Sequence, residues 1–202
     1  MSNIKEITTC EIITYPTPDD WLTIRNDFLS SQRKTSNTPP SDSLKLKYLV
    51  SGHSPIYGLE YRWEWKNLPY WIAMHFKTHH VGIHQITSSQ RNDIQREYDR
   101  RKAPQDAPVN HRCIANASAI IATSQKRLCL TASSETRNAW EMFLTELEKV
   151  DPLIVKLCVK PCVARNGLCP EVFSDCRWNT TQKFEDSVKE YRKLFKTGNL
   201  DI

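Results

Sequence analysis

The chain has 202 residues, of which 39% are hydrophobic and 25% are charged, values that are typical of a soluble globular protein. Only five glycines are present, which excludes glycine-rich phosphate loops, and the formal net charge of +5 suits anionic ligands such as nucleotides. The lysines and arginines are scattered among acids, and no apolar run approaches the roughly 18 residues that would cross a bilayer. We therefore expect neither a membrane nor a nucleic-acid partner.

The N-terminal sequence MSNIKEITTC lacks the apolar segment of a secretory signal. The chain has seven cysteines, an odd number, and in the absence of an export signal we expect their thiols to stay reduced. These observations predict a cytoplasmic protein. The length favours one domain over residues 1–202.

In chain order, the first part of the sequence predicts two strands and two helices. Residues 8–17 alternate in polarity and contain β-branched side chains, which predicts a strand, and residues 17–31 follow with an amphipathic helical pattern. Residues 56–66 alternate large apolar and charged side chains, the pattern of a half-buried strand. Residues 67–80 have apolar side chains at helical spacing and predict a helix.

The second part of the sequence is predicted to be mainly helical. Residues 90–111 are charged and then rich in proline, which predicts a short helix followed by a loop. Residues 112–130 and 133–152 have apolar residues three and four apart and predict buried helices, while residues 153–159 fit either a helix or a strand. An amphipathic helix is predicted over residues 180–196. The expected fold class is α+β, an antiparallel sheet followed by a helical second half.

Short motifs follow one another in order between residues 51 and 137. SGHSP (51–55) precedes THH (78–80) and SSQR (88–91), and these are followed by an arginine and a proline four residues apart, by NASAIIATSQKR (116–127) and by ASSETR (132–137). This order resembles the flavin-dependent thymidylate synthase family. The resemblance covers roughly residues 7–155, and it leaves residues 156–202 as a cysteine-containing segment and a C-terminal helix.

The chain departs from that family mainly on the flavin side. The family's Arg-His-Arg signature is Thr78-His79-His80 here, and the arginine of its Asn-Ala-Arg-Ser motif is Ser118. The arginines that the family uses on the substrate side are kept.

The resemblance implies an enzyme that transfers a folate-derived one-carbon group to dUMP with reduced FAD. NADPH and methylenetetrahydrofolate would be co-substrates, and the protein would be a homo-oligomer, a tetramer. Arginine forks and hydroxyl groups are the donors best suited to a phosphate, and an arginine beside the uracil carbonyl would stabilise charge that develops there. The residues implied are Ser88, Ser89, Arg91, Arg100 and Arg127 for the substrate, Arg127 for catalysis, and His53, His79, His80 and Asn116 for the flavin.

Other interpretations of the same residues stay open. The arginines could be solvated surface groups, His53 could serve only its own turn, and Asn116 could cap its own backbone. At the level of the whole protein, the alternatives are a homologue that binds a nucleotide without flavin chemistry and a module that binds nucleic acid or protein.

Two groups of residues suggest a metal. A histidine-only site is one hypothesis, and a structural zinc site made of four late cysteines is the other; the alternative for the cysteines is that they are ordinary buried or incidental thiols. The histidines are His75, His79, His80 and His84, and the cysteines are Cys158, Cys162, Cys169 and Cys176.

Overall fold

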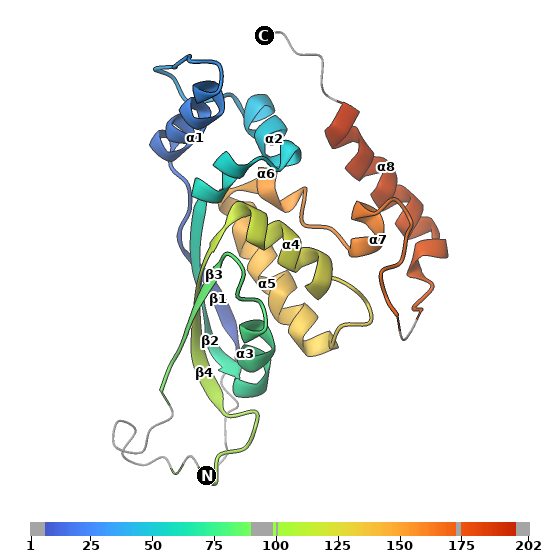
Figure 1. Ribbon diagram of the computed structural model, residues 1–202. Helices are drawn as coiled ribbons and strands as arrows, with labels where there is room; N and C mark the ends of the chain where they lie inside the picture. Colours follow the sequence, from blue (N-terminus) through green and yellow to red (C-terminus); the bar gives the residue numbers. More distant parts are fainter. Residues whose placement is uncertain (1–6, 90–98, 100, 173–174, 197–202) are drawn as a thin grey trace.

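A computed structural model describes residues 7–89, 99, 101–172 and 175–196, and it contains a four-stranded antiparallel sheet with helices against one face (Figure 1). The strand order is β1-β2-β4-β3. This arrangement confirms the predicted α+β fold class. The strands are β1 (Thr9–Thr14), β2 (Glu60–Pro69), β3 (Ile83–Thr87) and β4 (Pro108–Asn116).

The helices follow the amphipathic segments of the sequence, with short turns of 3-10 helix between them. In Figure 1, α3, α4 and α5 lie against the sheet, and α7 and α8 lie farther from it. The α-helices are α1 (Pro18–Ser30), α2 (Asp42–Ser51), α3 (Tyr70–Lys77), α4 (Ala117–Arg127), α5 (Ser134–Val150), α6 (Pro152–Val155), α7 (Pro161–Ala164) and α8 (Gln182–Lys196), and the 3-10 helices are η1 (Ser54–Gly58) and η2 (Trp178–Thr180).

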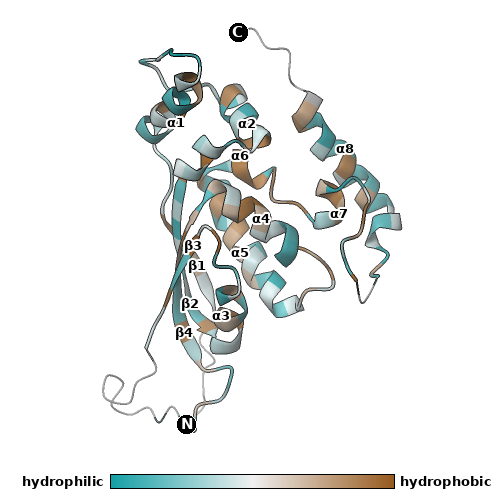
Figure 2. Cartoon of the chain, viewed as in Figure 1, coloured by the Kyte–Doolittle hydropathy of each residue, from teal (hydrophilic) through white to brown (hydrophobic). Residues whose placement is uncertain are grey.

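The core lies between β2 and α5. Because side chains alternate along a strand, Tyr61, Trp63 and Trp65 all point inward and are completely buried. The Trp63 ring stacks on that of Phe143 with their centroids 4.2 Å apart. The opposite face of the sheet is charged, as the ion pair between Lys66 and Glu11 illustrates. In Figure 2, the helices that cover the sheet carry hydrophobic stretches, as on α4, α5 and α6.

Hydrogen-bonded polar side chains link β4 to β3 and to the loop before β3. The Gln85 amide nitrogen donates to the backbone carbonyls of Phe76 and His79, at 2.9 and 2.5 Å. The Gln85 carbonyl oxygen therefore accepts from His111 Nε2 at 3.0 Å, and Thr87 Oγ1 donates to His111 Nδ1 at 2.9 Å. Gln85 thus holds the loop that contains His79 in place.

The predicted helix over residues 112–130 is wrong in its first part. β4 continues to Asn116, and α4 begins at Ala117. The small residues of this segment fit either periodicity, and pairing with β2, where Trp63 lies opposite Cys113, decides for the strand. Asn116 marks the change, because its side-chain oxygen accepts from the Ala119 amide at 2.9 Å and caps α4.

Most of the other predicted elements are confirmed. Thr17 and Asp20 form a capping box at the start of α1, and Ser133 caps α5. The predicted short helix in residues 90–111 falls largely outside the described residues, and the loop predicted after it is wrong at its end, because β4 begins at Pro108. Among the residues that are described, no helix is long and apolar enough to span a membrane.

Candidate functional site

A hollow of about 460 Å³ lies along α4, and its volume is in the usual range for small-molecule sites. Three parts of the chain form it: η1, the loop between α3 and β3, and α4 itself. The lining that the structure describes includes a lysine, hydroxyls, an amide and two histidines, and it includes no carboxylate. Its residues are Tyr57, Thr78, His79, His80, Val81, Gly82, Asn116, Ser118, Ala119, Ala122, Thr123 and Lys126.

A glycine is needed where the loop approaches α4. Gly82 has a φ of +72°, and a Cβ placed on it would lie 2.9 Å from both Ala119 Cβ and Asn116 Nδ2. Any side chain at this position would push the loop away from α4 and displace Asn116. Gly82 is not among the residues predicted from the sequence, although its place just after the polar THH stretch is a usable signal.

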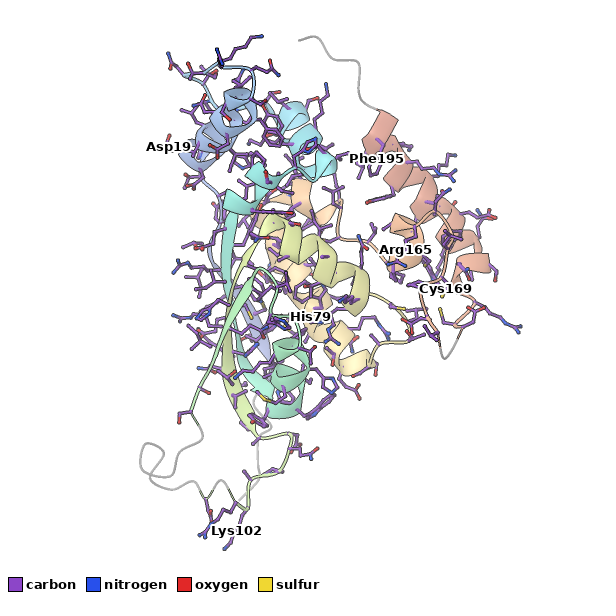
Figure 3. The ribbon with its side chains drawn as sticks, in the orientation of Figure 1. Asp19, His79, Lys102, Arg165, Cys169 and Phe195 are labelled. Atoms are coloured by element: carbon purple, nitrogen blue, oxygen red, sulfur yellow. The ribbon has the colours of Figure 1, made fainter. Side chains whose placement is uncertain are left out.

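His79 is the lining residue whose electrostatics are most altered. Burial, with added repulsion from Arg127 and Lys126, lowers the pKa of His79 from 6.5 to about 4. The imidazole is therefore neutral near pH 7, and its Nε2 is buried without a hydrogen-bond partner. Figure 3 shows His79 on the helix-covered side of the sheet. A buried ring nitrogen without a partner is uncommon in folded proteins, and it marks His79 as a candidate functional residue.

Arg127, the predicted catalytic residue, turns toward α3. Its Nη2 donates to the His75 carbonyl at 2.7 Å and to Thr78 Oγ1 at 3.2 Å, and its guanidinium lies 5.8 Å from the centre of the Phe76 ring. Burial lowers the pKa of Arg127. The adjacent Lys126, which the sequence analysis did not single out, is the cation that lines the hollow. The catalytic role of Arg127 stays a prediction.

The structure brings His79, His80 and Asn116 together at the hollow, but the other predicted residues that it describes lie elsewhere. Ser88 lies past the end of β3, where its hydroxyl accepts a hydrogen bond from the backbone N–H of Asn110 at 3.0 Å. Ser89 is next to it, and His53 precedes η1 with its ring edge toward Phe28. Two of the predicted substrate residues lie outside the described residues, Arg91 and Arg100.

A second hollow, of about 620 Å³, adjoins the first along α4. It shares Ser118, Ala122 and Lys126 with the first hollow, and it gains a second cation from Arg165 after α7. The carboxylate of Glu171 also lines this second hollow.

The predicted metal ligands are not assembled. Among the described residues, no three histidine, cysteine, aspartate or glutamate side chains are placed to hold a metal ion. His84 lies on β3, so it does not share a helical face with the other histidines. Cys158 is buried beside Ser124 and Asp151, and this burial raises the pKa of its thiol to about 12. The structure therefore does not bring Cys158 together with the other three predicted cysteines.

Comparison with known proteins gives a likeness in structure alone. No protein-family model matches the sequence, and no curated protein matches it. Among solved structures, thymidylate synthase X from Helicobacter pylori with FAD and dUMP superposes with a TM-score of 0.57 at 12% identity, covering 76% of this chain and all of that one. The chain has the fold of thymidylate synthase X.

A second structure of that enzyme, also complexed with FAD and dUMP, gives a TM-score of 0.58 at 13% identity over 75% of this chain. The UMP/dUMP methylase PolB from Streptomyces cacaoi, bound to 5-Br dUMP, gives 0.56 at 13% identity, covering 75% of this chain and 94% of that one. These identities are low, so the likeness to thymidylate synthase X establishes the fold, and the chemistry has to be argued from the site.

Proposed function

We propose that the chain binds a dUMP-like nucleoside monophosphate and FAD in the two adjoining hollows, and that it transfers a folate-derived one-carbon group to the nucleotide. The observation that supports this most directly is a hollow without carboxylates that combines Lys126, Asn116 and a neutral His79 on the thymidylate synthase X fold. Such a lining suits a planar heterocycle that has an anionic group attached.

The residues present fit a flavin dinucleotide. His79 has a buried ring nitrogen without a partner, and Gly82 lets the loop pass close to α4 beside Asn116. A dinucleotide is longer than the first hollow, but the second hollow continues it past Lys126 toward Arg165. Those two cations suit a diphosphate.

Each lining side chain has a definite part to play in binding. The Asn116 Oδ1 atom is occupied by the Ala119 amide, so only its Nδ2 is left to donate to a ligand carbonyl or phosphate. Ser118 can donate to the same ligand, and Tyr57, which is 55% exposed, can cover a ring from the solvent side. Neutral His79 makes a hydrogen bond without adding charge. When bound, reduced FAD supplies the hydride.

The remaining roles rest on the resemblance. In this proposal Ser88, Ser89, Arg91 and Arg100 bind the nucleotide phosphate, Arg127 polarises the uracil carbonyl, and His53 and His80 contribute to the flavin pocket. NADPH and methylenetetrahydrofolate are the proposed co-substrates, and a homotetramer is the proposed assembly.

A second candidate function is a homologue that binds the nucleotide without flavin chemistry. The replacement of Arg-His-Arg by Thr78-His79-His80 favours it, because two cations that the family places beside the flavin are missing here.

The absorption spectrum of the freshly purified protein distinguishes the two candidates. The flavin-dependent enzyme should show visible flavin absorbance, or acquire it when FAD is added, and it should convert dUMP to dTMP with NADPH and methylenetetrahydrofolate. The Gly82→Ala variant should lose flavin, because the added Cβ would collide with Ala119 and Asn116 and displace Asn116 from the hollow. A colourless protein that takes up no FAD but is stabilised by dUMP would support the second candidate instead.

A further inference from the structure

Four cysteines from three separate parts of the chain line one small cavity. Cys129 comes from the loop between α4 and α5, Cys162 from α7, and Cys169 and Cys176 from the segment between α7 and α8, on which Figure 3 labels Cys169. The cavity measures about 10 Å³, close to the ~10–15 Å³ that a single water needs. The cavity therefore has room for a single water molecule or metal ion, and four thiols line it.

The surrounding segment contains little regular structure. Between α6 and α8 the only regular structure among the described residues is α7, with four residues, and η2, with three. Two large apolar side chains of this segment, Leu168 and Val172, are 74% and 85% exposed. Short loop-rich segments are commonly stabilised by a disulfide or a metal.

A cation is also in position to balance negative charge. Lys160 lines the cavity, and its ammonium lies 4.7 Å from the centre of the Trp178 ring, which also lines it. Four thiolates around a divalent ion leave an excess of negative charge that a neighbouring lysine would reduce.

We propose that Cys129, Cys162, Cys169 and Cys176 bind one zinc ion as a tetrahedral structural site. Each ligating thiol releases its proton to solvent as its sulfur bonds the zinc, and no redox change is involved. The four sulfurs are not yet at ligand spacing in the structure. Closure requires the exposed Cys169 and Cys176 side chains to turn toward the two buried thiols.

This set differs from the one expected from sequence in a single member. Cys129 replaces Cys158, which lies in the core away from the cavity. The difference gives the test a matched pair of variants. The proposal is independent of nucleotide binding, so either can fail without the other.

The experiment measures zinc in the full-length protein purified without chelator, together with alkylation of its native thiols. We expect about one zinc per chain, and Cys169 and Cys176 should resist alkylation until zinc is removed. Cys129→Ser should lose the zinc, as should Cys176→Ser, whose exposed position makes misfolding a minor concern. Cys158→Ala and Cys10→Ser should keep it.

Cobalt supplies a spectroscopic check on the ligands. Cobalt-loaded wild type should show the visible bands of a tetrahedral thiolate site, and Cys176→Ser should weaken them. A protein without zinc whose Cys169 and Cys176 react at the same rate with and without chelator would overturn the proposal. So would a disulfide among the four cysteines, loss of zinc in folded Cys158→Ala, or full zinc content in Cys129→Ser.

Discussion

Replacing Arg127 by alanine should destabilise the protein, because the structure uses this side chain to join α4 to the C-terminal end of α3. The guanidinium donates to the His75 carbonyl, one of the last carbonyls of α3, and to Thr78 Oγ1, and it lies over the Phe76 ring. A hydrogen bond from a charged donor contributes about 1.5–3 kcal/mol, and a half-exposed cation–π contact about 0.5–1 kcal/mol.

The second of these hydrogen bonds is long, at 3.2 Å, so we expect Arg127→Ala to lower the free energy of unfolding by about 2–3 kcal/mol in total. For a chain of this size, that loss corresponds to a decrease in Tm of about 4–12 °C. The neighbouring Lys126→Ala is the matched control, because Lys126 is exposed and lines the hollow; its effect on stability should stay within about 0.5 kcal/mol.

Chemical denaturation followed by circular dichroism measures both variants. An Arg127→Ala protein as stable as wild type, or a Lys126→Ala protein destabilised equally, would refute this account of the two side chains. Activity per folded molecule then tests the predicted catalytic role separately. If Arg127 polarises the uracil carbonyl, its alanine variant should lose more in kcat than in dUMP affinity.

Three further predictions follow from the core and from the resemblance. Tyr61→Phe should cost about 1.5–3 kcal/mol in denaturant unfolding, since the Tyr61 hydroxyl donates to the buried Asp151 carboxylate at 2.7 Å; a cost below about 0.5 kcal/mol would contradict this. Burial holds the pKa of His111 at about 4, below its ordinary 6.5, so the unfolded chain binds the proton first. The contribution of neutral His111 to the free energy of unfolding should be fully present above about pH 6.5 and should fall as the pH drops toward 4. In a series of urea titrations at different pH, His111→Gln should make the dependence of this free energy on pH shallower. An unchanged slope in the variant would count against this explanation. Light scattering should show a tetramer at micromolar concentration, and a monomer would count against the resemblance.

Local signals in the sequence predicted much of the fold. The capping box at Thr17, the serine before α5 and the alternation of β2 each have a short-range physical cause, so they can be recognised without the tertiary structure. The boundary between β4 and α4 could not be predicted in this way. The apolar residues on both sides of Asn116 fit either period, and only pairing with β2 selects the strand.

The site was less predictable because it depends on orientation. Lys126 and Arg127 are neighbours in sequence, but one helical step of about 100° sends the first to the hollow and the second to α3. Cysteine spacing is a similar case. Cys158 and Cys162 are close in sequence, yet Cys129, far from both, shares the cavity with Cys162. Such choices follow from tertiary packing, which a motif does not encode.

Calorimetric titration of the purified protein with dUMP tests the central claim most directly. We predict saturable binding by wild type that is at least about tenfold weaker in Arg100→Ala, because this variant removes a charge-assisted contact to the nucleotide phosphate. UMP and dTMP serve as control ligands. No dUMP binding by wild type, or the same affinity in wild type and Arg100→Ala, would contradict the account.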